Sequence, residues 1–252
     1  WMQFCVFQPI FRTHGSSQSS CERRIWKFHN FDLQRDAFQL RYTLVPYICN
    51  AARQAYDTGV SICRPLYYEW PEENKAYSVE DEYLFGDDIL VSPISTPVNG
   101  NDMSERKTWL PEGLWYDICR NRMLYGGRTI VDEYSLSEIP YFIRQGSVIP
   151  CNPEVMHLKS EPASLTIHPR EGSFEGMPEE RAWKVVFFSV GEPSSVSVDG
   201  NETSSWSYDE QTCRLTVDVP SRSCSEAIVV RMKEVETALQ SIAGNGFDMR
   251  YD

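Results

Sequence analysis

The chain has 252 residues, of which 41% are hydrophobic and 13% aromatic, and this composition excludes an intrinsically disordered protein. Its 36 acidic residues against 24 basic ones give a net charge of -12, and no cluster of cations stands out. We therefore expect no nucleic-acid partner, because phosphate binding needs clustered cations. The chain lacks a run of about 18 apolar residues, so we also expect no membrane span.

The first fourteen residues hold the most informative pattern. An apolar run at residues 4–7 leads through Pro9 to Arg12 and His14, and a serine-rich stretch follows. This pattern predicts a buried strand that presents a cation and an imidazole at its C-terminal end, where the active sites of parallel α/β barrels lie. On spacing alone, a second interpretation fits the same pattern: Arg12 is an ion-paired residue at the rim of the fold, and His14 is a structural histidine.

A helix and a second strand are predicted next. Apolar residues recur at three- and four-residue steps over residues 35–58, which predicts a helix that Pro46 kinks and Gly59 caps. Residues 59–66 have the pattern of another buried parallel strand, so the order is that of a βαβ unit. The acidic loop that follows, residues 69–73, either rims a site or is solvated, and the solvated loop is the favoured interpretation.

From residue 83 onward the pattern is typical of β-structure. Asp87 and Asp88 interrupt an apolar stretch, and adjacent strand residues point to opposite faces, so we interpret them as turn and supporting residues rather than as a catalytic pair. A Pro-Glu-Gly turn inside residues 107–117 predicts a β-hairpin. Gly146, in the apolar stretch 139–150, is expected to allow a backbone turn.

The polar, proline-containing residues 151–163 predict a domain boundary. Turn signals at Gly172, Gly200 and Pro220 then separate strand patterns, which predicts a small β-sandwich. The expected strands cover residues 164–168, 183–188, 196–198, 215–219 and 227–231.

The eight cysteines have no zinc-site spacing, and we expect neither a metal nor a cofactor. Cys213 and Cys224 flank neighbouring strands, and the sequence leaves open whether they pair. The chain opens with Trp1 inside an apolar pattern, which indicates a piece of a longer protein. Localisation is therefore left unassigned.

Several segments resemble glycoside hydrolase family 31, the α-glucosidase and α-xylosidase family. The pattern Trp-x-Gln-x-x-x-Phe-x-Pro-x-x-Arg-x-His at residues 1–14 is similar to a late-barrel motif of that family. YLFGDDILVSP at residues 83–93 is similar to the segment that leaves its barrel. Further similar segments are residues 41–48, 59–66, 107–117 and 139–150.

The resemblance implies a fold that is α/β plus all-β. It predicts the final strands and helices of a (β/α)8 barrel at residues 1–82, followed by two C-terminal β-sandwich domains, the proximal one at residues 83–151 and the distal one at residues 152–232. Residues 233–252 form a tail of unknown role.

The resemblance also implies the C-terminal portion of a retaining α-glycosidase that hydrolyses terminal α-linked glucose or xylose. In the family, the histidine that matches His14 reaches the sugar, so His14 is the expected substrate-binding residue. Arg12 is assigned to the same site, where it is expected mainly to orient a neighbouring carboxylate. The two catalytic carboxylates of the family precede this motif, so no catalytic residue is assigned and the chain is not expected to be active alone.

Two partners follow from this interpretation: an oligosaccharide or α-glycoside substrate, and the missing N-terminal part of the barrel, joined to the chain or present as another chain. The alternative is a non-catalytic β-rich module that binds carbohydrate or a partner chain.

Overall fold

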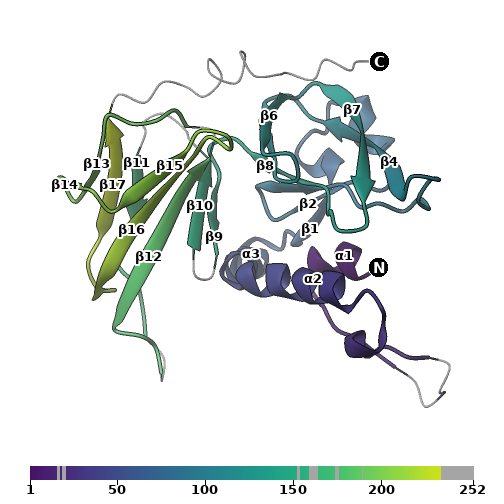
Figure 1. Cartoon of the computed structure of the whole chain (residues 1–252), viewed down its shortest axis with the longest axis horizontal. Coiled ribbons are helices and arrows are strands. Elements are labelled where there is room, and N and C mark those ends of the chain that lie inside the picture. The colour runs from purple at the N-terminus through teal and green to yellow at the C-terminus, as the bar shows by residue number, and fades with distance from the viewer. Residues whose placement is uncertain are drawn as a thin grey trace.

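The α-helices precede the β-strands along the chain in the computed structural model (Figure 1). The structure describes residues 1–15, 18, 21–151, 154–158, 164–173, 176–188 and 190–233. Most of the predicted boundary segment and nearly all of the C-terminal tail lie outside the described residues. None of the described helices is long and apolar enough to cross a membrane.

The opening apolar run is a helix, so the predicted strand is wrong. Helix α1 covers Met2–Val6, and residues 7–15 after it form neither helix nor strand. A short apolar run fits either element, because both can bury it. Here Val6 and Phe7 are fully buried, and the Phe7 ring lies 4.9 Å from that of Tyr141, so the run is buried without pairing with a strand.

The predicted long helix is present as two helices. After the short 3-10 helix η1 (Ile25–Lys27), α2 covers Phe31–Thr43 and α3 covers Val45–Thr58. Pro46 lies in the first turn of α3, where a missing backbone N–H leaves no hydrogen bond unmade, so it begins a helix instead of kinking one. Gly59 caps α3 as predicted: its φ is 75°, and its N–H donates to the Ala55 carbonyl at 2.9 Å.

The central sheet has six strands in the order β1-β2-β3-β8-β5-β6, and every neighbouring pair is antiparallel. Strand β1 pairs with β2, so the predicted βαβ unit does not form; the opening segment, which was to supply the parallel partner, is not a strand. The strands are β1 (Cys63–Pro65), β2 (Tyr83–Phe85), β3 (Ile89–Val91), β8 (Tyr141–Arg144), β5 (Leu114–Asp117) and β6 (Arg122–Tyr125), with the 3-10 helices η2 (Leu66–Tyr68) and η3 (Asn74–Tyr77) between β1 and β2.

The hairpin predicted at residues 107–117 is also wrong, although its turn is present. Strand β4 (Met103–Leu110) pairs over eight residues with β7 (Arg128–Ser135), while β5 after the turn joins the central sheet. The carbonyl of Pro111 in this turn accepts the indole N–H of Trp115 at 2.9 Å. The longer β7 gives β4 a full-length partner, which the four residues of β5 do not offer.

The C-terminal half of the structure contains two sheets that share a core. One has the order β15-β16-β12-β10-β9 and the other β11-β17-β13-β14, and their apolar side chains pack together. The strands are β9 (Val148–Pro150), β10 (Glu154–Leu158), β11 (Ser164–Ile167), β12 (Glu180–Phe188), β13 (Ser195–Val198), β14 (Asn201–Thr203), β15 (Trp206–Asp209), β16 (Arg214–Ser223) and β17 (Ile228–Lys233).

All five strands predicted after the boundary segment are present; β10, which lies within that segment, and β14 and β15 are additional, and β9 belongs to the apolar stretch 139–150. Pro220 is not the predicted turn, because it lies inside β16. Opposite it, the pairing register shifts between Arg181 and Trp183, and such a bulge tolerates a residue without a backbone N–H. Gly146 allows the predicted turn between β8 and β9, with a φ of 85°.

One apolar core joins the helices to both strand regions. It includes Phe7 next to α1, Phe85 and Tyr116 in the central sheet, and Phe188 in β12. The rings of Tyr116 and Phe188 lie 5.1 Å apart. The division of the β-region into two separate sandwiches therefore remains a prediction, since side chains from both parts share this core.

Candidate functional site

A cavity of about 770 Å³ lies beside the opening segment, and Arg12 and His14 both line it. Both side chains are exposed, and a guanidinium nitrogen of Arg12 donates to Nδ1 of His14. An arginine is always a donor, so Nδ1 accepts and the other ring nitrogen, Nε2, carries the proton. The imidazole can therefore donate a hydrogen bond to a ligand in the cavity.

The rest of the cavity wall comes from the opening segment with α1, from residues between 23 and 34 that lead into α2, and from Leu136 in the loop between β7 and β8. Apolar and uncharged polar side chains dominate it, and its charged residues are arginines. The other residues that line it are Trp1, Met2, Gln3, Cys5, Thr13, Arg23, Phe28, His29, Asn30, Leu33, Gln34 and Leu136. No carboxylate is among them, so within the described residues this cavity can hold a neutral polar ligand but offers no acid and base pair.

The chain segment that carries Arg12 and His14 is held from two sides. Arg41 of α2 donates to the carbonyls of Val6 at 2.8 Å and of Pro9 at 2.9 Å, and also to that of Gln8. On the other side, the Tyr83 hydroxyl donates to the Phe7 carbonyl at 3.0 Å. Burial lowers the pKa of Arg41 from its ordinary value.

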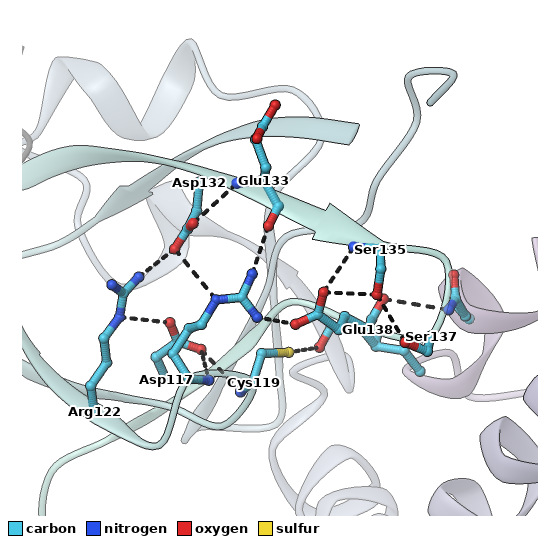
Figure 2. Close-up of polar contacts among 11 residues, drawn as sticks. Asp117, Cys119, Arg122, Asp132, Glu133, Ser135, Ser137 and Glu138 are labelled. Carbon is cyan, nitrogen blue, oxygen red and sulfur yellow. Dashed lines mark hydrogen bonds and ion pairs between the residues drawn. The ribbon is translucent and has the colours of Figure 1, made fainter. Parts of the chain in front are cut away.

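The loop between β7 and β8 brings Leu136 to the cavity, and a polar network fixes it (Figure 2). The Glu138 carboxylate accepts the N–H of Ser135 at 2.8 Å and its hydroxyl at 2.9 Å, and it forms an ion pair with Arg120. The side-chain amide of Gln3 donates to the Leu136 carbonyl, which links this loop to α1. The loop is thus tied to the same helix that lines the cavity.

Figure 2 also shows the buried part of this network, around Asp117. Its carboxylate accepts the Cys119 N–H at 3.0 Å and the Arg122 side chain at 3.2 Å, and Arg122 pairs in turn with Asp132. Burial raises the pKa of Asp117, although Arg122 opposes the shift. Because these groups are paired with one another and none of them lines the cavity, we interpret the network as structural.

Asp87 and Asp88 lie in the turn between β2 and β3, as predicted, and neither lines the cavity. Burial alone would raise the pKa of Asp87, but hydrogen bonds from Gln54 and Arg64 hold it below its ordinary value. Burial raises the pKa of Asp88, whose carboxylate accepts the Ser147 hydroxyl at 2.8 Å. The two carboxylates thus have separate supporting roles.

The remaining candidates lie apart from the cavity. The glutamates of the acidic loop, Glu69, Glu72 and Glu73, are exposed and do not line it. Cys213 and Cys224 are both free thiols. Over the part of the chain that the structure describes, no group of three His, Cys, Asp or Glu side chains is placed to hold a metal ion.

Sequence reasoning missed Arg41, Gln3 and Leu136. Arg41 and Gln3 bind backbone carbonyls that lie 32–35 and 133–135 residues away along the chain, so the family-like segments in which both stand do not reveal these contacts. The available signal for Arg41 was the family-like segment 41–48, and there the pair Arg41 and Tyr42 also fits a simple anchor of the helix.

Two family models match the chain. The one described as "Glycosyl hydrolases family 31 TIM-barrel domain" matches residues 1–51, and the one described as "Glycosyl hydrolase family 31 C-terminal domain" matches residues 59–149. Together they cover more than half of the chain.

Curated proteins and solved structures are similar as well. The chain is 34% identical over 155 residues to a 1,6-alpha-glucosyltransferase of Sporosarcina globispora, which covers 60% of this chain and 12% of that protein. It is 33% identical over 153 residues to an alpha-xylosidase of Saccharolobus solfataricus, covering 60% of this chain and 20% of that protein. The chain thus spans a fifth or less of the length of these two relatives.

The fold is similar to that of the cycloalternan-forming enzyme from Listeria monocytogenes, solved in complex with a pentasaccharide substrate. The TM-score is 0.76 at 22% identity, and the match covers 94% of this chain and 27% of that one. The likeness therefore extends through both strand regions.

Proposed function

Because the chain belongs to glycoside hydrolase family 31, we propose that it is the C-terminal portion of a retaining α-glycosidase that hydrolyses terminal α-linked glucose or xylose. The observation that carries this proposal is the cavity of about 770 Å³ that Arg12 and His14 line. A wall of apolar and neutral polar groups suits a sugar, which offers hydroxyl groups and apolar C–H faces.

In this proposal, His14 binds the substrate. Its Nε2–H donates to a sugar hydroxyl, and this contact fixes the orientation of the sugar ring for reaction at the anomeric carbon. Arg12 sets the tautomer of His14 by donating to Nδ1. This contact differs from the role expected for Arg12, which was to orient a carboxylate.

The catalytic carboxylates are proposed to come from another part of the protein. A retaining glycosidase needs two carboxyl groups about 5 Å apart across the scissile bond. No described residue places a carboxylate in the cavity wall. We therefore assign catalysis to the remaining part of a barrel, joined to this chain or bound to it, and we expect the 252-residue chain alone to be inactive.

An exposed apolar side chain at the cavity supports this second partner. Trp1 lines the cavity and is 97% exposed. A large apolar side chain in this position favours contact with an apolar partner surface. The missing barrel strands and helices are the proposed partner at this place.

The test compares the 252-residue chain with the full-length protein on aryl α-glucoside and aryl α-xyloside. Only the full-length protein should turn over, and the preferred substrate decides between glucose and xylose, for which relatives of both kinds exist. Replacing His14→Ala should lower kcat/KM by about a hundredfold, because the sugar is then no longer held in the reacting orientation. The control His168→Ala, an exposed histidine outside the cavity, should leave kcat/KM unchanged.

Two outcomes would contradict the proposal. Turnover by the 252-residue chain alone would place the carboxylates within it. Maltose binding by the chain, with no turnover by the full-length protein on either substrate, would favour the alternative of a non-catalytic carbohydrate-binding module.

A further inference from the structure

The path of the segment that presents Arg12 and His14 depends on side-chain contacts. Residues 7–15 form neither helix nor strand, and Pro9 has no backbone N–H. Carbonyl groups in such a segment need partners outside a regular ladder, because leaving them buried and unpaired is costly. One residue, Arg41 of α2, donates to two of them, the carbonyls of Gln8 and Pro9, and also to the carbonyl of Val6 at the end of α1.

The same face of α2 also holds the segment next to Arg12. The ring of Phe38 lies 4.4 Å from the ring of Phe11, and the guanidinium of Arg41 lies 5.9 Å above that ring. Phe38 and Arg41 are three residues apart, so they project from one side of the helix. Helix α2 therefore contacts the segment from Val6 to Phe11, and Arg12 is the next residue.

An arginine suits this role better than a lysine. Its planar guanidinium presents several N–H donors in a fixed geometry, and hydrogen bonds to a charged group are stronger than neutral ones. One nitrogen of Arg41 contacts the carbonyls of Val6 and Gln8 and the other contacts that of Pro9, so the side chain joins three peptide groups of this path. An ammonium group is a compact point charge that does not match three carbonyls in this arrangement.

We propose that Arg41 is a positioning residue for sugar recognition: by binding the backbone carbonyls of Val6, Gln8 and Pro9, it sets where Arg12 and His14 enter the cavity. The role in recognition rests on the proposed function. The positioning itself is a statement about this chain and is testable without activity.

The first experiment measures backbone motion in the 252-residue chain by ¹⁵N relaxation. In Arg41→Met and Arg41→Lys, the order parameters of residues 10–14 should fall from about 0.85 to below about 0.6, and the ring resonances of His14 should shift. The control Arg53→Met removes an exposed arginine of α3 that pairs with Asp57 at 2.7 Å, and it should change neither. If Arg41→Met does not fold, Arg41→Lys, which keeps the charge, carries the test.

Unchanged order parameters and His14 resonances in Arg41→Lys would overturn the proposal. The amide resonances of β12 and β16 report whether the rest of the fold is intact, because these strands lie outside the segment. Loosening confined to residues 10–14 supports the proposal, whereas loosening that extends through those strands would reduce Arg41 to a residue of general stability.

The second experiment is a double-mutant cycle in the full-length enzyme. Arg41→Lys alone should lower kcat/KM by about ten- to a hundredfold, the loss expected when a charge-assisted contact that holds a binding group is removed. In a His14→Ala background the same substitution should have little further effect, because Arg41 acts through His14. If the losses of kcat/KM from the two substitutions were additive, the positioning role would be overturned. An inactive parent enzyme would refute the proposed function, and the relaxation experiment would then decide alone whether Arg41 positions the segment.

Discussion

Glu82 is a buried carboxyl group whose charge should make the fold sensitive to pH. It is 5% exposed, and its two oxygens accept the Trp109 N–H at 3.0 and 3.2 Å, while Arg106 lies 3.7 Å away. Burial raises the pKa of Glu82 to about 7, against the hydrogen bond from Trp109. We predict that Glu82→Gln, a neutral group of the same shape, removes a pH dependence of stability that the natural chain has.

The size and sign of this effect follow from proton linkage. The ordinary carboxyl value is 4.5 and the folded value about 7, so the free energy at stake is about 3 kcal/mol. Between these two values the folded chain keeps a proton that the unfolded chain has lost. The stabilisation is thus fully present below about pH 4.5 and is lost as pH rises to about 7.

The assay is urea unfolding at a series of pH values for the natural chain and for Glu82→Gln. Other carboxyl groups titrate in both proteins, so the difference between the two curves isolates Glu82. Relative to the variant, the free energy of unfolding of the natural chain should fall by about 3 kcal/mol between pH 4.5 and pH 7.5. A difference that stays constant over this range would refute the reasoning, and the exposed control Glu80→Gln should give a constant difference near zero.

Three further results are expected. Gly86→Ala should lower the free energy of unfolding by about 3 kcal/mol, because its φ is 67° and the new methyl group would overlap the hydroxyl of the buried Tyr47. Gly200→Ala, which has open space around it, should lower the free energy of unfolding by only about 1 kcal/mol. Urea unfolding of both variants measures the two values. Phe188→Ala should cost about 3 to 5 kcal/mol by leaving a cavity in the shared core, and an effect under 1 kcal/mol would contradict that packing. Burial raises the pKa of Cys63 to about 11, so at pH 8 this thiol should react with a disulfide reagent at least about tenfold more slowly than the exposed Cys49, as mass spectrometry of the modified chain would show.

The strands of the C-terminal half could be predicted because local signals act in the same direction there. Alternating apolar residues, such as those around Val217 in β16, bury one face of a sheet, and turn residues separate the runs. The cap at Gly59 was predictable for the same reason, since a left-handed residue after a helix strongly favours glycine. Pro220 misled the prediction because it lies at a bulge, where β16 has one residue more than its partner β12.

The partners of the strands could not be predicted from local patterns. Residues 107–117 have good hairpin chemistry, yet β4 pairs with β7 and β5 with two other strands, because strand length and burial decide between competing partners. The opening segment misled the prediction in another way: four apolar residues do not distinguish a helix from a strand.

The candidate site was predictable only in part. The sequence marks Arg12 and His14, and both line one cavity, although their role in sugar binding remains a proposal. The residues that hold them in place act over long distances, as Arg41 does through three carbonyls, and nothing near Arg41 in the sequence indicates such contacts.

Strand β9 has a consequence for anyone who wishes to divide this chain. It directly follows the turn after β8, yet its hydrogen bonds go to β10 in the other sheet, and Ile149 within it packs with Val186 and Phe188. A cut after Pro150 would separate β9 from β10 and leave β10 as a bare sheet edge in the C-terminal piece, and a cut after Arg144 would remove Ile149, Val186 and Phe188 from the shared core of the N-terminal piece. Expression of either half alone should therefore yield aggregates, and engineering of this region is best done on the intact chain.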